Sequence, residues 1–339
     1  MLTAVRPTFN VARAAEVKIE GGLRAMTNAR VAGLRSVELG VPDLNRSSDF
    51  YQKVWGLEEV VSDGDTIHLR GTGSEHHIVT LRQRPKAELL AVHFSAPDRH
   101  AVAALHAKAK AFGASDVSEV GELPRGAGGG FGFRFKTPEG LPLAISADVT
   151  PHSDVIPDRS RPIKLTHVVL NSARIDEQTS FFRDLLGFRH SDSTDMMEFI
   201  RCCADHHSVA FARGSGPSLN HMAYEMQNVD GLMRGAGRMK QSGFTIEWGV
   251  GRHGPGNNIF SYFVEPNGFV TEYTTEVEQV DEATYMAHDA EYWRNFPGRP
   301  CRWNMAGHPS NRLKAAMSGE LVADENLRCE EVMARTLGR

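Results

Sequence analysis

The sequence predicts an α+β protein in which one structural module is written twice in tandem. Residues 31–60 and residues 162–191 both give a short apolar strand, a polar turn and an amphipathic helix. The similarity continues downstream at an offset that stays between 128 residues (144 to 272) and 131 residues (36 to 167). Because a constant offset over the length of a domain is hard to obtain by chance, we interpret the two halves as an internal duplication.

Local sequence signals define the elements of each half. The first helix of each half carries an aromatic pair and stops at a glycine, Gly56 or Gly187, which suits the left-handed position after a helix end. Two apolar strands, a second helix and a segment with a hairpin-like turn follow in each half, at 75–82, 89–96, 98–112 and 137–146, and again at 205–212, 218–226, 229–241 and 265–274. A mixed order of strands, with helices on one side of a sheet, favours the α+β class.

The repeat and its flanking segments divide the chain into five parts. These are an N-terminal arm at 1–28, a first module at 29–149, a polar, proline-rich linker at 150–162, a second module at 163–276 and a C-terminal extension at 277–339. The extension lies outside the repeat and holds several aromatic residues, so we expect it to close over a pocket or to form an oligomer interface. Its charged end is predicted to be helical.

Composition excludes several classes of function. The 339 residues carry a net charge of −4, so there is no basic excess for binding nucleic acid or an anionic membrane. No run of 18 apolar residues is present, which argues against a membrane span. The four cysteines form no CxxC pair, and a reduced, cytoplasmic protein is the simplest interpretation. The glycine-rich run at 126–132 lacks the Lys-Ser/Thr of a phosphate loop and is predicted to be a turn between strands.

Comparing the two halves points to a metal site in the second one. Three strands of the second half carry metal-competent side chains, namely His167, His221 and Glu272. The repeat-equivalent positions of the first half hold small side chains, namely Ser36, Ala91 and Ala144. A single strand histidine is more often a hydrogen-bonded core residue, but the joint occurrence of all three favours ligation. Two imidazoles and one carboxylate suit mononuclear non-haem Fe(II), so we expect one iron site per chain.

With these residues identified, the pattern resembles the type I extradiol ring-cleavage dioxygenases of the vicinal oxygen chelate superfamily. The resemblance spans residues 31–276 and is most specific in the segments LTHVVL, LNHMAYE and NNIFSYFVEPNGFVTEY, which contain the three proposed ligands. It implies two tandem vicinal oxygen chelate modules, each made of paired βαβββ units that form a cup-shaped mixed sheet. It also implies that only the C-terminal module binds metal.

The resemblance further implies three catalytic residues. His207 in HHSVAF matches the acid–base histidine of the family, and His253 in GRHGPGN matches a histidine in the loop over the substrate. Tyr262 precedes Glu272 by ten residues, where the family has a tyrosine that hydrogen-bonds the substrate.

Each of these assignments has a structural alternative. His207 has a counterpart in the first half, His77, and a duplicated histidine pair is compatible with a structural role. Tyr262 is also compatible with a place in the core, and His253 with simple surface exposure. His206 is expected to point to the opposite face of a strand from His207 and to be structural.

The implied function is extradiol (meta) cleavage of a catechol by dioxygen at Fe(2+) in the degradation of aromatic compounds, with Mn(2+) as a possible replacement. The expected partners are a catecholic small molecule, dioxygen and further copies of the chain in a homo-oligomer. Three alternatives stay open: a keto-acid-type dioxygenase, a glyoxalase-like isomerase and a non-catalytic ligand-binding protein on the same scaffold. Monocyclic, bicyclic and carboxylated rings are all compatible with the sequence.

Overall fold

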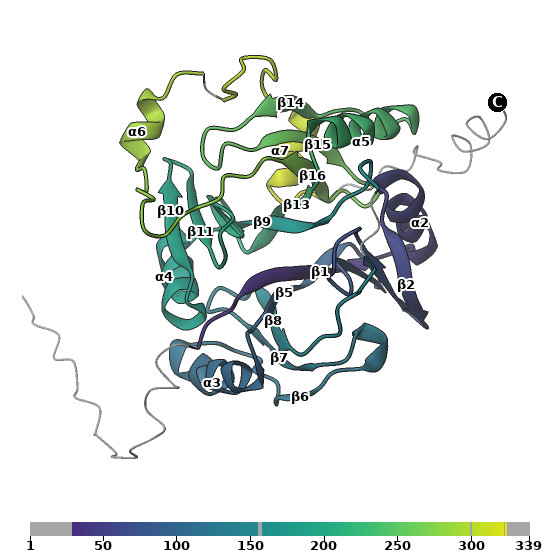
Figure 1. Ribbon diagram of the computed structural model, residues 1–339, viewed down its shortest axis with the longest axis vertical. Coiled ribbons are helices and arrows are strands. Elements are labelled where there is room, and N and C mark those ends of the chain that lie inside the picture. Colours follow the sequence, from purple (N-terminus) through teal and green to yellow (C-terminus); the bar gives the residue numbers. More distant parts are fainter. Residues whose placement is uncertain (1–28, 155–157, 299, 322, 324–339) are drawn as a thin grey trace, which may run out of the picture.

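Each half of the chain folds into an eight-stranded mixed sheet with helices packed against its strands, as the computed structural model shows for residues 29–154, 158–298, 300–321 and 323 (Figure 1). The predicted α+β class and the tandem repeat of modules are therefore confirmed. The predicted N-terminal arm and the charged end of the extension lie outside the described residues. None of the helices in the described segments is both long enough and apolar enough to cross a bilayer.

The first module contains eight strands in the sheet order β2-β3-β4-β1-β5-β8-β7-β6. Its elements are β1 (Gly33–Val41), α2 (Leu44–Asp49) with the π-helical turn η1 (Phe50–Trp55), β2 (Glu58–Asp63), β3 (Thr66–Arg70), β4 (Val79–Gln83), β5 (Glu88–Ser95), α3 (Arg99–Ala109) with the 3₁₀ turn η2 (Lys110–Phe112), β6 (Gly121–Glu122), the 3₁₀ turn η3 (Arg125–Ala127), β7 (Phe131–Lys136) and β8 (Pro142–Ala147).

The second module repeats this order as β10-β11-β12-β9-β13-β16-β15-β14. Its elements are β9 (Lys164–Ser172), α4 (Ile175–Leu186), β10 (Arg189–Ser193), β11 (Met197–Arg201), β12 (Val209–Arg213), β13 (Ser218–Glu225), α5 (Val229–Gln241), β14 (Trp248–Arg252), β15 (Ile259–Val264) and β16 (Val270–Thr275).

Strand register shows that the two modules are equivalent residue by residue. Each module joins two βαβββ units through an antiparallel pair of central strands, β1 with β5 and β9 with β13. Ser36 lies opposite His93 in the first pair, and His167 lies opposite Ala223 in the second. The ladder therefore places Ser36 and His167 at the same position, as the sequence offset predicts.

Glycines end the elements where the sequence predicts turns. Gly56 after η1 and Gly187 after α4 have φ values of 97° and 76°, the left-handed region that glycine tolerates without strain. A Cβ at Gly187 would lie 2.5 Å from the Cβ of Arg30, so no side chain fits there. The glycine-rich run forms the turn between β6 and β7, as expected.

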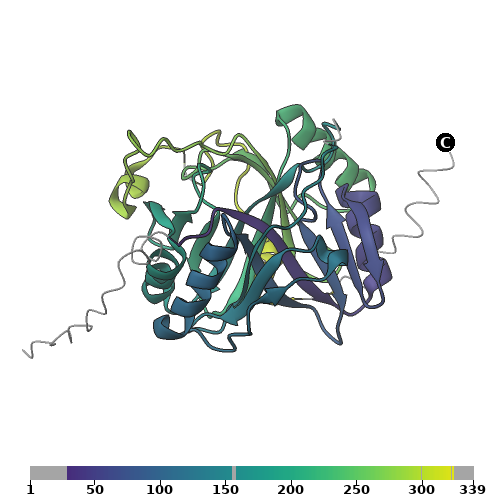
Figure 2. The same ribbon diagram turned by 60° about the horizontal axis from the view of Figure 1, so that its bottom comes forward.

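One hydrophobic core spans both modules. The ring of Trp55 from η1 stacks on Tyr273 of β16, with centroids 3.8 Å apart and planes 8° apart. The Tyr273 hydroxyl also donates a 2.6 Å hydrogen bond to the Trp55 carbonyl. Helix α3 packs beside α4, and α5 packs beside η1, so the modules meet along their helices as well as their sheets (Figure 2). The first module therefore supports the strand that carries Glu272.

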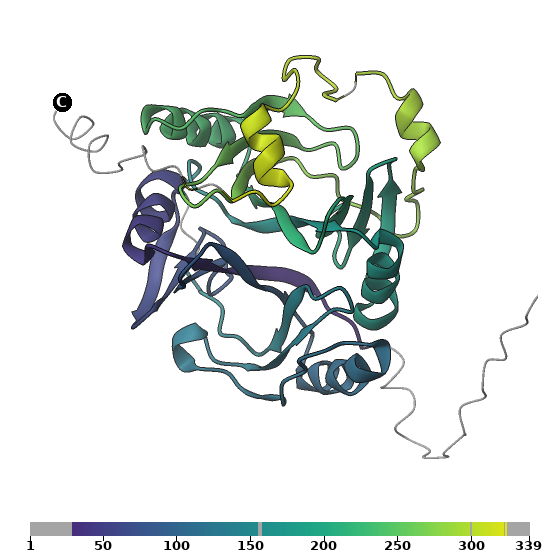
Figure 3. The same cartoon turned by 180° about the vertical axis from the view of Figure 1, so that it is seen from behind.

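The C-terminal extension returns to the second module and covers part of its sheet (Figure 3). It contains α6 (Ala290–Asn295) and α7 (Asn311–Met317). Leu313 and Ala316 of α7 are buried against Phe260, Tyr262 and other side chains of β15 and β16. The extension therefore forms one wall of the second module, and the first module has no equivalent of it among the described residues.

The inter-module stack yields a prediction about stability. Trp55→Ala should lower the free energy of unfolding by about 3–5 kcal/mol, because it removes a fully buried aromatic side chain. Urea unfolding followed by circular dichroism measures this change. Trp303→Ala is the control, since Trp303 is 40% exposed, and it should cost less than about 1 kcal/mol. Equal costs for the two variants would contradict the proposed role of the stack.

Candidate metal centre and substrate pocket

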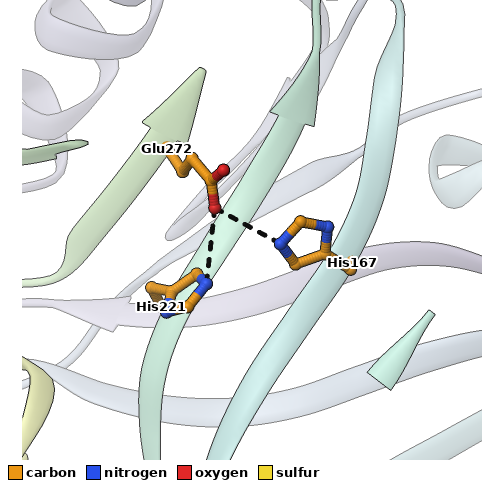
Figure 4. A group of neighbouring side chains, drawn as sticks. All are labelled: His167, His221 and Glu272. Carbon is orange, nitrogen blue, oxygen red and sulfur yellow. Dashed lines mark ion pairs between the residues drawn. The ribbon is translucent and has the colours of Figure 1, made fainter. Parts of the chain in front are cut away.

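His167, His221 and Glu272 come together on three adjacent strands, β9, β13 and β16 (Figure 4). Glu272 Oε2 lies 3.3 Å from His167 Nε2 and 3.4 Å from His221 Nε2. One potential ligand atom from each residue lies within 4.8 Å of the others. Among the described residues, this is the only group of three or more His, Cys, Asp or Glu side chains that could hold a metal ion.

The carboxylate of Glu272 is fully buried, and its environment suits a cation. Burial by itself would raise the pKa of Glu272, but the imidazoles of His167 and His221 outweigh this effect and lower the pKa well below its usual range. Oε2 nevertheless accepts no well-oriented hydrogen bond within the described structure. A buried anionic oxygen without a donor is costly, and a metal ion between it and the two imidazole nitrogens would compensate the charge.

The other oxygen of Glu272 is held by Asn258, which the sequence analysis missed. Asn258 Nδ2 lies 3.3 Å from Glu272 Oε1 and donates a 2.8 Å hydrogen bond to Thr274 Oγ1. Asn258 is completely buried and lies just before β15. Asn258 lies within the segment NNIFSYFVEPNGFVTEY, but only the fold shows that its amide reaches Glu272.

His253 and Tyr262 form a hydrogen-bonded pair beside the proposed metal site. His253 Nε2 lies 3.0 Å from Tyr262 Oη, and Tyr262 pairs with Glu272 across β15 and β16. The His253 ring stacks on Phe260 with centroids 3.9 Å apart. Burial raises the pKa of the Tyr262 hydroxyl well above its usual value, and the nearby charge of Glu272 adds to this effect.

His207 also reaches the site, but the expectation that its neighbour His206 points to the opposite face of a strand is wrong. His206 and His207 precede β12 in a bend and do not lie on a strand, so their side chains do not alternate between faces. Their Nδ1 atoms lie 3.0 Å apart, and His206 Nε2 lies 3.0 Å from Asp192 Oδ2. The ring of His207 lies 4.2 Å from that of His167, centroid to centroid. His206 therefore links His207 to a buried carboxylate.

Five of the six side chains predicted to be ligands or catalytic residues line one cavity of about 430 Å³, namely His167, His207, His221, His253 and Tyr262. The sixth, Glu272, contacts His167 and His221. The outer wall of the cavity is largely apolar and comes from β11, the loop before it, the start of β14 and the C-terminal extension. The main apolar wall residues are Met196, Met197, Phe199, Trp248, Trp293 and Phe296. Asp195 and Arg294 also line the cavity, and they form an ion pair with each other at 2.9 Å. The extension thus lines the pocket, which is one of the two roles expected of it.

The equivalent surface of the first module is filled by ion pairs. Glu38 stands where the second module has Val169, and it contacts Arg82 at 2.9 Å and Arg134 at 2.5 Å. Arg134 lies opposite Ala144, just as Tyr262 lies opposite Glu272. The first module therefore lacks the proposed ligand side chains and has charged side chains where the second module has Val169 and Tyr262.

Comparisons with known proteins agree with this geometry. The model of the Glyoxalase/Bleomycin resistance protein/Dioxygenase superfamily matches residues 33–145 and 164–273. A solved structure described as the Mn(II)-bound glyoxalase from Novosphingobium aromaticivorans is 41% identical, with a TM-score of 0.77, and the match covers 84% of this chain and 94% of that one.

Curated relatives are named as dioxygenases. Manganese-dependent 2,3-dihydroxybiphenyl 1,2-dioxygenase from Geobacillus genomosp. 3 is 28% identical over 70% of this chain and 82% of that protein. Metapyrocatechase 2 from Cupriavidus necator is 34% identical, but that match spans only 36% of this chain and 39% of that protein. The family resemblance seen in the sequence is confirmed by these matches.

The three proposed ligands yield a prediction about metal content. His221→Ala should lower the affinity for Fe(2+) or Mn(2+) by more than about 100-fold, since losing even an outer partner of a ligand typically costs about 10–100-fold. Elemental analysis after reconstitution and desalting measures the bound metal. Ser36→Ala alters the position that matches His167 in the first module, and it should leave the metal content unchanged. Full metal occupancy in His221→Ala would remove His221 from the site.

Proposed function

Because this chain belongs to the Glyoxalase/Bleomycin resistance protein/Dioxygenase superfamily, we propose that it is an extradiol dioxygenase that opens the ring of a catechol beside its diol. The main support for this proposal is the set of side chains that surrounds the cavity. The imidazoles of His167 and His221 line a mostly apolar cavity and contact the fully buried carboxylate of Glu272. Three further side chains that can exchange protons line the same cavity, namely His207, His253 and Tyr262. The names of the curated relatives support the same reaction.

His167, His221 and Glu272 would hold the metal ion, which we propose to be Fe(2+). When bound, such an ion supplies Lewis acidity toward the diol and a path for electrons between substrate and dioxygen. The same ligands would also accept Mn(2+): one relative is named as manganese-dependent, and a similar solved structure is described as Mn(II)-bound. The protein ligands occupy one side of the site, and the cavity on the other side provides room for the substrate.

The His253–Tyr262 pair is placed to orient the substrate. Burial lowers the pKa of His253 to about 4, even though the charge of Glu272 acts in the opposite direction. His253 is therefore a neutral imidazole at neutral pH, and its Nε2 can accept a hydrogen bond from the hydroxyl of Tyr262 at 3.0 Å. The Tyr262 oxygen would then accept a hydrogen bond from the diol.

The hydrogen bonds of His206 determine which ring nitrogen of His207 carries the proton. Asp192 Oδ2 accepts a hydrogen bond, so in a neutral His206 the proton is on Nε2 and Nδ1 is an acceptor. His207 Nδ1 must then be the donor in the 3.0 Å contact between the two rings. His207 Nε2 therefore keeps its lone pair, and it can take up a proton during the reaction and return it to an oxygen of the substrate.

The walls of the cavity favour an uncharged, substituted ring. Asp195 and Arg294 are paired with each other, and the remaining outer wall is formed mainly by methionine and aromatic side chains. A carboxylated substituent would lose its hydration there without gaining a dedicated partner. We therefore propose a catechol that carries an apolar substituent as the preferred substrate.

A glyoxalase-type isomerase is the second candidate, because the 41% identical solved structure is described as a glyoxalase. An isomerase rearranges its substrate without consuming dioxygen, so oxygen uptake separates the two activities. The His207–His253–Tyr262 set around the metal site favours the dioxygenase.

The proposed reaction predicts a fixed stoichiometry. Protein reconstituted anaerobically with Fe(2+) and then mixed with substituted catechols in air should consume one dioxygen per ring and give a yellow, ring-opened product. An oxygen electrode and absorbance spectra measure both quantities. Turnover of a hemithioacetal without oxygen uptake, together with no reaction toward any catechol, would instead establish the isomerase.

A second prediction separates His207 from its counterpart in the first module. His207→Ala should reduce kcat by about 10²–10⁴-fold while sparing metal content and substrate binding, since it removes an acid–base group. His77→Ala is a matched control, because His77 forms the same 3.0 Å contact between Nδ1 atoms with His76. It should change kcat by less than about 3-fold. If His207→Ala retains full activity, His207 has no part in the reaction.

A further inference from the structure

A β-bulge places an amide beside one of the proposed metal ligands. The register between β9 and β13 shifts between Leu219 and His221, so Asn220 is left out of the ladder. Its side chain consequently reaches the ring of the next residue, and His221 Nδ1 lies 2.8 Å from Asn220 Oδ1. The Nε2 atom of the same ring faces Glu272.

The hydrogen bonds continue from Asn220 to the C-terminal extension. Asn220 Nδ2 donates to Asn171 Oδ1 at 2.9 Å. Asn171 Nδ2 in turn donates to the backbone carbonyl of Met317 at 2.7 Å and to Ser218 Oγ at 2.8 Å. Met317 is the last residue of α7, where helix carbonyls lack partners within the helix. A continuous chain of hydrogen bonds thus joins α7 to His221.

The carbonyl at the end of this chain sets the direction of every bond in it. A backbone carbonyl only accepts, so Asn171 must present its NH₂ group to Met317 and its oxygen to Asn220. Asn220 must then donate to Asn171 and present its own oxygen to His221. The proton of a neutral His221 is therefore held on Nδ1, and the lone pair is left on Nε2.

We propose that Asn220 and Asn171 are positioning residues that fix the tautomer and orientation of His221 for metal binding, with the C-terminal extension as their anchor. The inference rests on the metal site of the proposed function. Metal-ligating histidines commonly donate their second ring nitrogen to such an outer partner. His167 lacks one among the described residues, since its buried Nδ1 has no hydrogen-bond partner. Of the two histidine ligands proposed, only His221 therefore has a hydrogen-bond partner on its second ring nitrogen among the described residues.

The first module serves as an internal control for this inference. It has the same bulge, because its register shifts between Leu89 and Ala91 and leaves Leu90 at the position of Asn220. Gly40 stands at the position of Asn171, since it pairs with Glu88 as Asn171 pairs with Ser218. The amide pair thus occurs in the module that has the proposed ligands and is missing from the module that lacks them.

The test compares two substitutions at one position. Asn220→Leu introduces the residue that the first module carries in the same bulge, so the strand accommodates it. Asn220→Asp keeps an acceptor for His221 Nδ1. We expect Asn220→Leu to weaken Mn(2+) binding by about 10–100-fold, and Asn220→Asp to stay within about 3-fold of the wild type. Isothermal titration calorimetry with Mn(2+) measures the affinity, and thermal unfolding of each apoprotein checks that the fold is kept.

Nitrogen-15 NMR of the histidine side chains gives a readout that needs no metal. In the wild-type apoprotein, His221 should be protonated on Nδ1, whereas Asn220→Leu should populate the Nε2-protonated form. Asn171→Leu leaves Asn220 in place but frees its amide to rotate, and it should give a mixture of the two forms.

Two results would overturn the inference: a wild-type His221 protonated on Nε2, or Mn(2+) binding by folded Asn220→Leu as tight as that of the wild type. Failure of the proposed function is a separate outcome. It would appear as a wild-type protein that has the Nδ1-protonated His221 but neither retains metal nor consumes oxygen with catechols.

Discussion

The burial of one carboxylate, Glu272, is the constraint on which the second module depends. An anionic oxygen without exposure to solvent is tolerated only where cations or donors compensate its charge. Here Asn258 contacts one oxygen, while the other faces the imidazoles of His167 and His221. The strand that carries Glu272 is held from behind by the stack between Trp55 and Tyr273. Packing between the modules and the chemistry of the site are thus tied together through β16.

The two modules use one backbone for two different purposes. The first holds a network of ion pairs around Glu38 and packs against the second module, so it supports that module. The second lines its pocket with apolar side chains, carries the proposed ligands and receives α7 as an extra wall. Because hydrophobic walls exclude water, they strengthen the electrostatic interactions of the few polar groups that remain in the cavity. The two modules therefore differ in role because of their side chains and the C-terminal extension, and not because of their backbones.

Much of the fold and the core of the site could be predicted from the sequence, because both depend on periodicity and on the repeat. The repeat matched His167, His221 and Glu272 to Ser36, Ala91 and Ala144 of the first half and so singled them out. The family resemblance added His207, His253 and Tyr262. The links that support these residues could not be predicted. Asn171 contacts Met317 across 146 residues, and the side chain of Asn220 reaches its neighbour only because of a bulge. His206 was misplaced for a related reason, since strand alternation does not apply to a bend.

The bulge in β13 and its twin in β5 bear on how such a site arises. A backbone distortion that is shared by both copies requires no new insertion or rearrangement in either one. Side-chain substitutions on the shared backbone are then enough to add or remove the proposed metal centre. The first module, which lacks the proposed ligands, shows the same backbone without a metal site. It offers protein engineers a backbone on which to rebuild a second centre one residue at a time, beginning with Leu90 and Ala91.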